Sequence, residues 1–142
     1  MAKKMKRTEL REHLYRMLFC LDFYQGEELF GQQELYLETL SEASDKEKQE
    51  LQDRFQQVTE HLDEIDARIE AKSNGWKATR LAKADLTVLR LAICEMLYDA
   101  DVPTGVAINE AVELAKAYGG DKSTGFVNGI LASVARELPD GQ

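Results

Sequence analysis

The sequence contains few of the residues that break helices, cross-link chains or bind metals. It has two prolines, two cysteines and two histidines among 142 residues. Both Cys20 and Cys94 stand in apolar helical patterns, where a thiol usually packs as a small hydrophobe, so no disulfide framework is expected. His13 and His61 lie on different expected helices, and no serine or cysteine nucleophile has a recognisable partner. The sequence therefore predicts no enzyme activity, no metal and no cofactor.

Long apolar runs are also scarce. The basic first residues lead into the polar segment 8–12 and not into the apolar core of a signal peptide. The most apolar stretch, residues 85–98, is too short to span a bilayer and contains Arg90 and Glu95. We therefore expect a cytoplasmic protein that does not enter a membrane.

Charge is distributed unevenly along the chain. The formal net charge is −8. Residues 1–16 contain six basic and two acidic residues, a net charge of +4, whereas the remaining residues contain 12 basic and 24 acidic ones, a net charge of −12. We call Lys3, Lys4, Lys6, Arg7 and Arg11 the basic arm. A polyanionic partner is expected to bind there.

Helical periodicity dominates the rest of the sequence. Residues 85–98 are apolar around most of the helix circumference, which predicts a buried central helix. Further helices are expected over about 8–23, 32–40, 46–72, 106–118 and from 123 toward Pro139. With about seven helices and no convincing strand, the fold class is all-α.

The segment Ser73-Asn74-Gly75 is a strong helix terminator and the best candidate for an internal boundary. We expect a single domain over residues 1–142 that consists of two packed small helical bundles. The N-terminal helical subdomain covers about 6–74, and the C-terminal helical subdomain covers about 76–138.

Aromatic residues follow the basic arm on the first helix. Tyr15, Phe19 and Phe23 are spaced four residues apart and form one stripe. For Tyr15 and Phe23 a core contact is the favoured interpretation. Basic residues neutralise phosphates and exposed aromatic rings stack on unpaired bases, so the combination suits single-stranded RNA better than a duplex. A solvated lysine-rich start remains the alternative.

Several motifs together resemble the NusB family of bacterial transcription antitermination factors. The resemblance covers nearly the whole chain. Its most specific motifs lie in the C-terminal half, whereas residues 25–75 share only the helical pattern. The matching positions are residues 103–116, Tyr118, Gly119, Ser123, residues 126–131, Asp85, residues 88–92, Glu95, Arg7, Arg11, Leu18 and Phe19.

The resemblance implies a non-catalytic RNA-binding adaptor with two bundles. Family members bind NusE, a small-subunit ribosomal protein, and with it the single-stranded boxA element of nascent, chiefly ribosomal, RNA. In the antitermination complex they help RNA polymerase pass terminators. Carried over by position, the RNA-binding residues are Lys3, Lys4, Lys6, Arg7, Arg11, Phe19, Lys122, Ser123 and Phe126.

The resemblance also implies a NusE-binding position at Asp85, at the expected exposed start of the central helix, where an ordinary N-cap is the competing interpretation. Thr8 and Glu9 interrupt the arginine run that is common in the family, so we expect weak RNA binding without NusE. The sequence leaves a homodimer of the free chain as a further alternative. A dimer that buries the basic arm would regulate access to it.

Two other functions compete with this one. Ribosomal RNA methyltransferases carry a NusB-like RNA-binding domain, but that interpretation requires a cofactor-binding domain beyond Gln142. In a purely protein-binding helical bundle, the basic arm would only be solvated. Replacement of Arg7 and Arg11 by glutamate separates this last interpretation from RNA binding.

Overall fold

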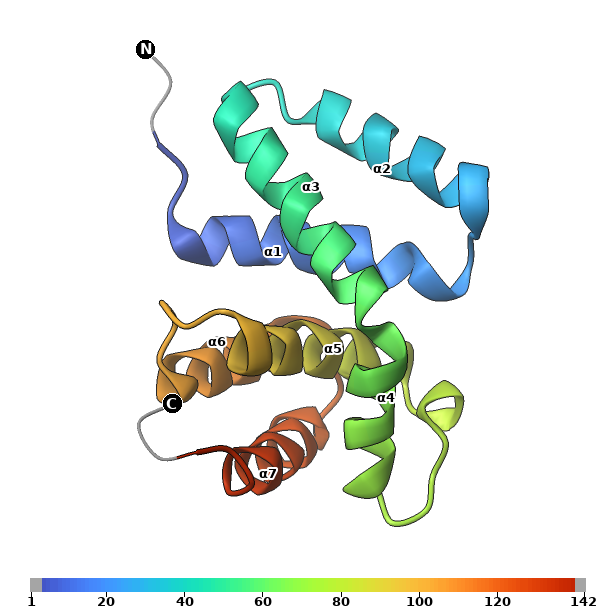
Figure 1. Cartoon of the computed structure of the whole chain (residues 1–142), viewed down its shortest axis with the longest axis vertical. Coiled ribbons are helices and arrows are strands. Elements are labelled where there is room, and N and C mark those ends of the chain that lie inside the picture. Colours follow the sequence, from blue (N-terminus) through green and yellow to red (C-terminus); the bar gives the residue numbers. More distant parts are fainter. Residues whose placement is uncertain (1–3, 140–142) are drawn as a thin grey trace. The chain divides into compact units, whose positions relative to one another are not determined.

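A computed structural model describes residues 4–139 of the chain as helices joined by short connections (Figure 1). The α-helices are α1 (Arg7–Leu18), α2 (Gly26–Thr39), α3 (Asp45–Glu60), α4 (Leu62–Ala71), α5 (Lys83–Tyr98), α6 (Thr104–Tyr118) and α7 (Ser123–Ala135). Two short 3₁₀ helices, η1 (Phe19–Asp22) and η2 (Ala78–Arg80), complete the set. No strand occurs within the described residues, and the predicted all-α class with seven α-helices is confirmed.

The chain forms two compact units, Met1–Gln57 and Val58–Gln142. The division lies near the end of α3, so α4 belongs to the C-terminal unit. The boundary expected from sequence lay further on, at Ser73–Gly75. This segment follows the end of α4 at Ala71, and Asn74 and Gly75 adopt positive φ angles of 54° and 85°. A strong helix terminator thus marks a turn within the C-terminal unit.

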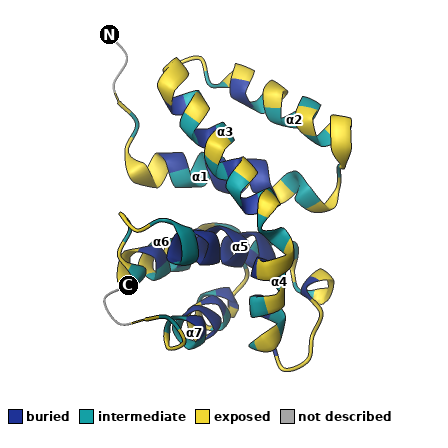
Figure 2. Cartoon of the chain, viewed as in Figure 1, coloured by how far each residue is buried: buried dark blue, intermediate teal, exposed yellow. Residues whose placement is uncertain are grey.

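The N-terminal unit is built from α1, η1, α2 and most of α3. Its core side chains come mainly from one face of α1 and from one seam of α3. Those with at most 6% exposure are Leu10, Leu14, Tyr15, Met17, Leu18, Leu37, Leu51 and Phe55. By contrast, α2 contributes only Leu37 to the core and exposes Phe30 and Leu35 (Figure 2).

Two helix boundaries in this part of the chain differ from the expectation. The helix expected over about 32–40 begins earlier, at Gly26, with Glu27 and Glu28 in its first turn, where carboxylates complement the helix dipole. The helix expected over 46–72 is interrupted at His61, whose φ and ψ of −110° and 17° are not helical.

The C-terminal unit packs α4, α6 and α7 against α5. Every residue from Asp85 to Met96 is buried, which confirms the expected central helix (Figure 2). On α6, the small side chains of Ala107, Ala111 and Ala115 are spaced four residues apart and are at most 2% exposed. Small residues in one helical row let neighbouring backbones approach closely. None of the helices within residues 4–139 has the length and apolar character needed to cross a membrane.

Candidate nucleic-acid interface

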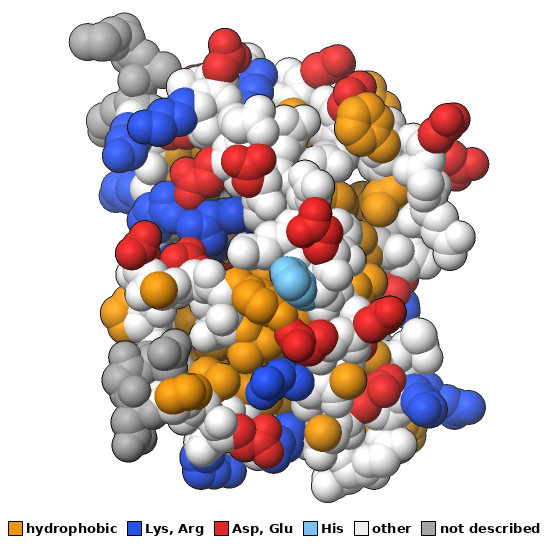
Figure 3. Space-filling view, in the orientation of Figure 1, with side chains coloured by type: hydrophobic (Ala, Val, Ile, Leu, Met, Phe, Trp, Pro, Cys, Tyr) orange, Lys and Arg blue, Asp and Glu red, His pale blue; other side chains and the backbone are white. Residues whose placement is uncertain are grey.

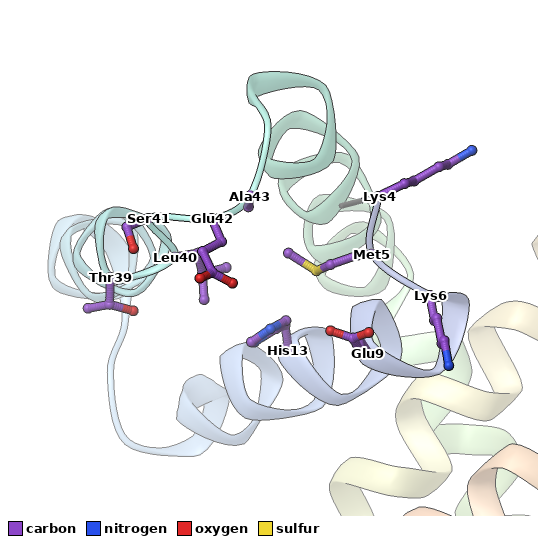
Figure 4. A pocket seen from close by; sticks show the side chains of 10 residues that line it. All are labelled: Lys4, Met5, Lys6, Glu9, His13, Thr39, Leu40, Ser41, Glu42 and Ala43. Carbon is purple, nitrogen blue, oxygen red and sulfur yellow. The ribbon is translucent and has the colours of Figure 1, made fainter. Parts of the chain in front are cut away.

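The described part of the basic arm begins as extended chain. Lys6 has φ and ψ of −72° and 154°, and side chains alternate along such a segment. Lys4 and Lys6 are exposed, whereas Met5 between them is half-buried and points toward a hollow (Figure 4). The extended conformation therefore presents the two ammonium groups and anchors the segment through Met5. Lys3, also predicted to bind RNA, lies outside the described residues.

The arm is tied to the start of α3 by one carboxylate. Ser44 and Glu47 form a capping box: the Glu47 amide donates to Ser44 Oγ at 3.1 Å, and the Ser44 amide donates to Glu47 Oε1 at 2.9 Å. The second oxygen, Oε2, accepts the Met5 amide at 2.7 Å. These backbone donors, first Ser44 and then Met5, lower the pKa of Glu47, with the Ser44 hydroxyl and the Lys4 charge acting in the same direction against desolvation.

Acidic side chains of α3 also lie beside the basic ones. Arg7 Nη1 is 2.8 Å from Glu50 Oε2, and Arg54 Nε donates to the same oxygen at 3.1 Å. Arg11, one turn after Arg7 on α1, is half-buried. In the N-terminal unit, Lys and Arg side chains gather near the start of the chain with Asp and Glu side chains among them (Figure 3). The basic surface is therefore partly neutralised by α3.

A hollow of about 880 Å³ lies between the arm, α1 and the connection from α2 to α3 (Figure 4). It is lined by Lys4, Met5, Lys6, Glu9, His13, Thr39, Leu40, Ser41, Glu42 and Ala43. The Nδ1 atom of His13 lies 2.7 Å from the Tyr36 hydroxyl, in hydrogen-bond contact. Burial, and then the charge of Arg16, lowers the pKa of His13, while Glu12 and Glu9 oppose the change. A neutral imidazole is therefore favoured at the base of this hollow.

The aromatic stripe divides into a buried and an exposed part. Tyr15 is 2% exposed, which confirms the core contact expected for it, but Phe23 is 59% exposed, so the core contact expected there is wrong. Phe19 is 37% exposed. Ring centroids are 6.3 Å apart for Tyr15 and Phe19 and 5.8 Å apart for Phe19 and Phe23. Phe23, missed from sequence, thus extends the exposed aromatic surface of Phe19.

Basic arm and aromatic surface lie at opposite ends of α1. Arg7 begins the helix and Phe19 follows it directly. At 1.5 Å per residue these positions are about 18 Å apart along the axis. A ligand that contacts both must therefore be an extended one, such as a polynucleotide strand.

Three predicted RNA-binding residues lie in the C-terminal unit, at the start of α7. Lys122 is exposed, Phe126 is half-buried, and Ser123 is only 6% exposed. The hydroxyl of Ser123 accepts the Gly120 amide at 3.0 Å. Ser123 thus holds the preceding loop, and Lys122 is the side chain that this loop presents.

Asp85 lies in the first turn of α5 and is 9% exposed, so the expectation of an exposed position is wrong. The competing interpretation as an N-cap is wrong as well, because Ala82 occupies the N-cap position and α5 starts at Lys83. The Oδ1 atom of Asp85 is buried and has no hydrogen-bond donor among the described residues. Such a carboxylate oxygen is costly to bury and calls for an explanation.

The candidate residues therefore form two groups. The basic arm and Phe19 belong to the N-terminal unit, while Asp85, Lys122, Ser123 and Phe126 belong to the C-terminal unit. Within the described residues, no three side chains of the His, Cys, Asp or Glu type gather in a way that could hold a metal ion.

Comparison with known proteins gives consistent matches along the chain. The model of the NusB family matches residues 8–136. The Transcription antitermination protein NusB of Agathobacter rectalis is 47% identical over 131 residues, which cover 92% of this chain and 100% of that protein. The protein of the same name from Lachnoclostridium phytofermentans is 48% identical over 130 residues, covering 92% and 98%.

Solved structures agree. T. maritima NusB is 36% identical, covers 95% of this chain and 94% of that chain, and has a TM-score of 0.84. A chain from a crystal structure of antitermination factors NusB and NusE in complex with dsRNA is 23% identical, covers 93% of this chain and 97% of that chain, and has a TM-score of 0.78, which is a likeness of fold. The seven-helix fold is thus that of the all-α transcription antitermination factors. The chain belongs to the NusB family.

Proposed function

We propose that this protein is a transcription antitermination factor that acts by binding and performs no catalytic step. It binds the boxA element of nascent, chiefly ribosomal, RNA together with NusE, and helps RNA polymerase pass terminators. The observation that carries the proposal is the family match over residues 8–136, together with a basic arm on an otherwise acidic chain. Nascent transcripts are made in the bacterial cytoplasm, where we place the protein.

RNA binding is assigned first to the N-terminal unit. Lys4 and Lys6 are exposed and supply ammonium groups, while Arg7 and Arg11 on α1 supply guanidinium groups for phosphates. Phe19, 37% exposed, offers a ring on which an unpaired base stacks. Lys3 completes the arm as predicted from sequence.

In the C-terminal unit, Lys122 and Phe126 provide the second group of RNA contacts. Because Ser123 is buried and holds the Gly120 amide, we assign it the role of fixing the loop that presents Lys122. NusE binding is assigned to the start of α5: if the Asp85 side chain rotates to the surface, its unpaired oxygen can accept a hydrogen bond from a NusE donor.

Binding to a boxA oligonucleotide, measured at several salt concentrations with and without NusE, tests the proposal. A scrambled strand and a duplex of the same sequence serve as competitors. We expect preferential binding of the single-stranded boxA sequence, strengthened by NusE and weakened by salt. Absence of any sequence preference, with NusE as well as without it, contradicts the proposal.

A charge-reversal variant separates RNA binding from binding of NusE alone. Arg7→Glu combined with Arg11→Glu removes two phosphate contacts. The slope of log K against the logarithm of the salt concentration therefore decreases in magnitude by about 1.4 for a single strand. Lys77→Glu combined with Lys116→Glu, at exposed positions of the C-terminal unit, is the charge-matched control. Loss of RNA binding with retained NusE binding, in the first variant only, is expected. Unchanged RNA binding favours a purely protein-binding bundle.

A further inference from the structure

A second hollow lies between the basic arm and the first turns of α3. Its volume is about 450 Å³, and its lining residues are Lys4, Arg7, Leu10, Ser44, Lys46, Glu47 and Glu50. We call it the Lys46 hollow. Three cations from three different segments face it: the extended arm, the start of α1 and the start of α3. Lys4 and Arg7 belong to the basic arm that is assigned to RNA, whereas Lys46 lies outside the arm.

The two carboxylates of the Lys46 hollow are not equivalent. Glu47 is 8% exposed, and its two oxygens already accept amides, from Ser44 at 2.9 Å and from Met5 at 2.7 Å. It is therefore a fixed part of the fold. Glu50 is half-buried, and within residues 4–139 it contacts the guanidinium groups of Arg7 and Arg54.

The cations of the Lys46 hollow differ in their ion pairing. Lys46 is exposed and has no ion-pair partner among the described residues. The side chain of Arg7 is 53% exposed while it contacts Glu50 at 2.8 Å. Ion pairs this exposed to water contribute little to stability and are screened by salt. Another anion can therefore replace Glu50 on Arg7 at low cost, and Arg54 remains to neutralise Glu50.

We propose that the Lys46 hollow binds a backbone phosphate of the RNA, that Lys46 is an RNA contact outside the basic arm, and that Glu50 is the carboxylate that this phosphate displaces from Arg7. The inference rests on the proposed function and deepens it. A phosphate takes the place of Glu50 because guanidinium groups bind phosphate and carboxylate in the same forked geometry. Glu50 thereby competes with the RNA phosphate for Arg7 and lowers the affinity of the basic arm for RNA.

Removal of the competing carboxylate tests the displacement. Glu50→Gln is expected to tighten binding of a boxA oligonucleotide about two- to fivefold at fixed salt, the range of exposed ion pairs. Asp53→Asn is the matched control, because it removes one negative charge from the same helix at a residue bonded to Gln49 and not to Arg7. Equal effects of the two variants overturn the displacement.

A double variant checks that the gain acts through Arg7. In an Arg7→Ala background, Glu50→Gln releases only Arg54, which does not line the Lys46 hollow, and its gain is expected to fall to that of Asp53→Asn. A gain that persists without Arg7 shows that Glu50 acts through Arg54 or through the general field and not through Arg7, and it overturns the displacement. Circular dichroism melting of each variant separates loss of binding from loss of folding.

Lys46 is tested by its own pair of variants. Lys46→Ala is expected to weaken RNA binding and to lower the salt dependence of log K by about 0.7, the value for one phosphate contact on a single strand. Lys48→Ala changes the same charge two residues further along α3, at a half-buried position that does not line the hollow, and is expected to have little effect. Equal effects of both variants overturn the site.

Failure of the inference differs from failure of the proposed function. If the double charge reversal at Arg7 and Arg11 leaves RNA binding intact, the proposed function fails. If that variant loses RNA binding while Glu50→Gln and Lys46→Ala behave like their controls, only the inference fails.

Discussion

Arg90 and Asp66 form a two-pronged ion pair that joins α5 to α4. Arg90 Nε donates to Asp66 Oδ1 and Arg90 Nη2 donates to Oδ2, each at 2.8 Å. The side chain of Arg90 is 3% exposed and that of Asp66 is 22% exposed. Without Asp66, this guanidinium would lose two charge-assisted hydrogen bonds while it stays removed from water, and an incompletely paired buried charge is much more costly than a pair.

Asp66→Ala is accordingly expected to lower the free energy of unfolding by about 3–5 kcal/mol, the usual cost of breaking a buried pair. Asp63→Ala, three residues earlier at an exposed position on α4, is the control and should change stability by no more than about 0.5 kcal/mol. Urea unfolding of both variants measures the difference. Similar small losses would mean that the ion pair is not needed to stabilise the unit.

Asp85→Asn should separate partner binding from stability. The substitution removes a buried negative charge whose Oδ1 lacks a donor, so the free energy of unfolding is expected to stay constant or rise. Binding of NusE is expected to weaken, because an amide is a poorer acceptor than a carboxylate for a charged donor. Thermal melting and NusE titration measure the two effects. Asp101→Asn, at an exposed position after α5, is the control, and equal NusE affinity of both variants would remove Asp85 from the interface.

Glu47 should make stability depend on pH in the acid range. Since the pKa of this carboxyl is lowered in the folded protein, its contribution is fully present above the unfolded pKa and is lost as the pH falls through the folded pKa. Glu47→Gln should therefore flatten the acid limb of a stability profile recorded by urea unfolding. An unchanged acid limb would show that the hydrogen bonds from Ser44 and Met5 do not hold the ionised form.

Two adjacent glycines before α7 should respond differently to alanine. A Cβ atom at Gly119 would lie 2.8 Å from the Ala115 carbonyl oxygen and would also collide with the Ser123 side chain, whereas at Gly120 it meets nothing within 4 Å. Gly119→Ala is expected to cost about 1–3 kcal/mol, the usual range for overpacking, and Gly120→Ala almost nothing. Thermal melting measures both, and equal melting temperatures would contradict the close approach.

RNA titration of the same glycine variants links this loop to function. Displacement of Ser123 should move Lys122 and weaken RNA binding by Gly119→Ala beyond any loss of folded protein. Equal affinity of Gly119→Ala and Gly120→Ala would remove the loop from the proposed interface.

Strong local patterns allowed most of the helices to be predicted. The central helix was recognisable because residues 85–98 are apolar on nearly all faces, and Leu86 and Leu89 are indeed 0% exposed. The break at His61 carried no such signal, since neither proline nor glycine is near. There the His61 ring stacks on Tyr98 at a centroid distance of 4.1 Å, and the Tyr98 hydroxyl donates to Glu64. Contacts between residues distant in sequence accompany that break, and periodicity cannot reveal them.

The candidate site was predictable in composition but not in detail. The four-residue spacing of Phe23 from Phe19 assumes an α-helix, but the chain turns as a 3₁₀ helix over Phe19–Asp22. This turns the Phe23 side chain away from the core while its ring stays 5.8 Å from that of Phe19. Pairing of Arg7 with Glu50 joins residues 43 positions apart and could not be read from either helix alone. Burial of Asp85 likewise depends on tertiary packing.

Glu47 couples the order of two segments, the basic arm and the start of α3. One carboxylate completes the cap of α3 and fastens the chain at Met5, so the order of the arm and the order of that helix end are coupled. By thermodynamic linkage, ordering the arm stabilises the first turn of α3 by the same coupling free energy with which ordering that turn stabilises the arm. A transcript that fixes the arm should therefore slow amide hydrogen exchange in the first turn of α3, which makes that turn a built-in reporter of RNA occupancy.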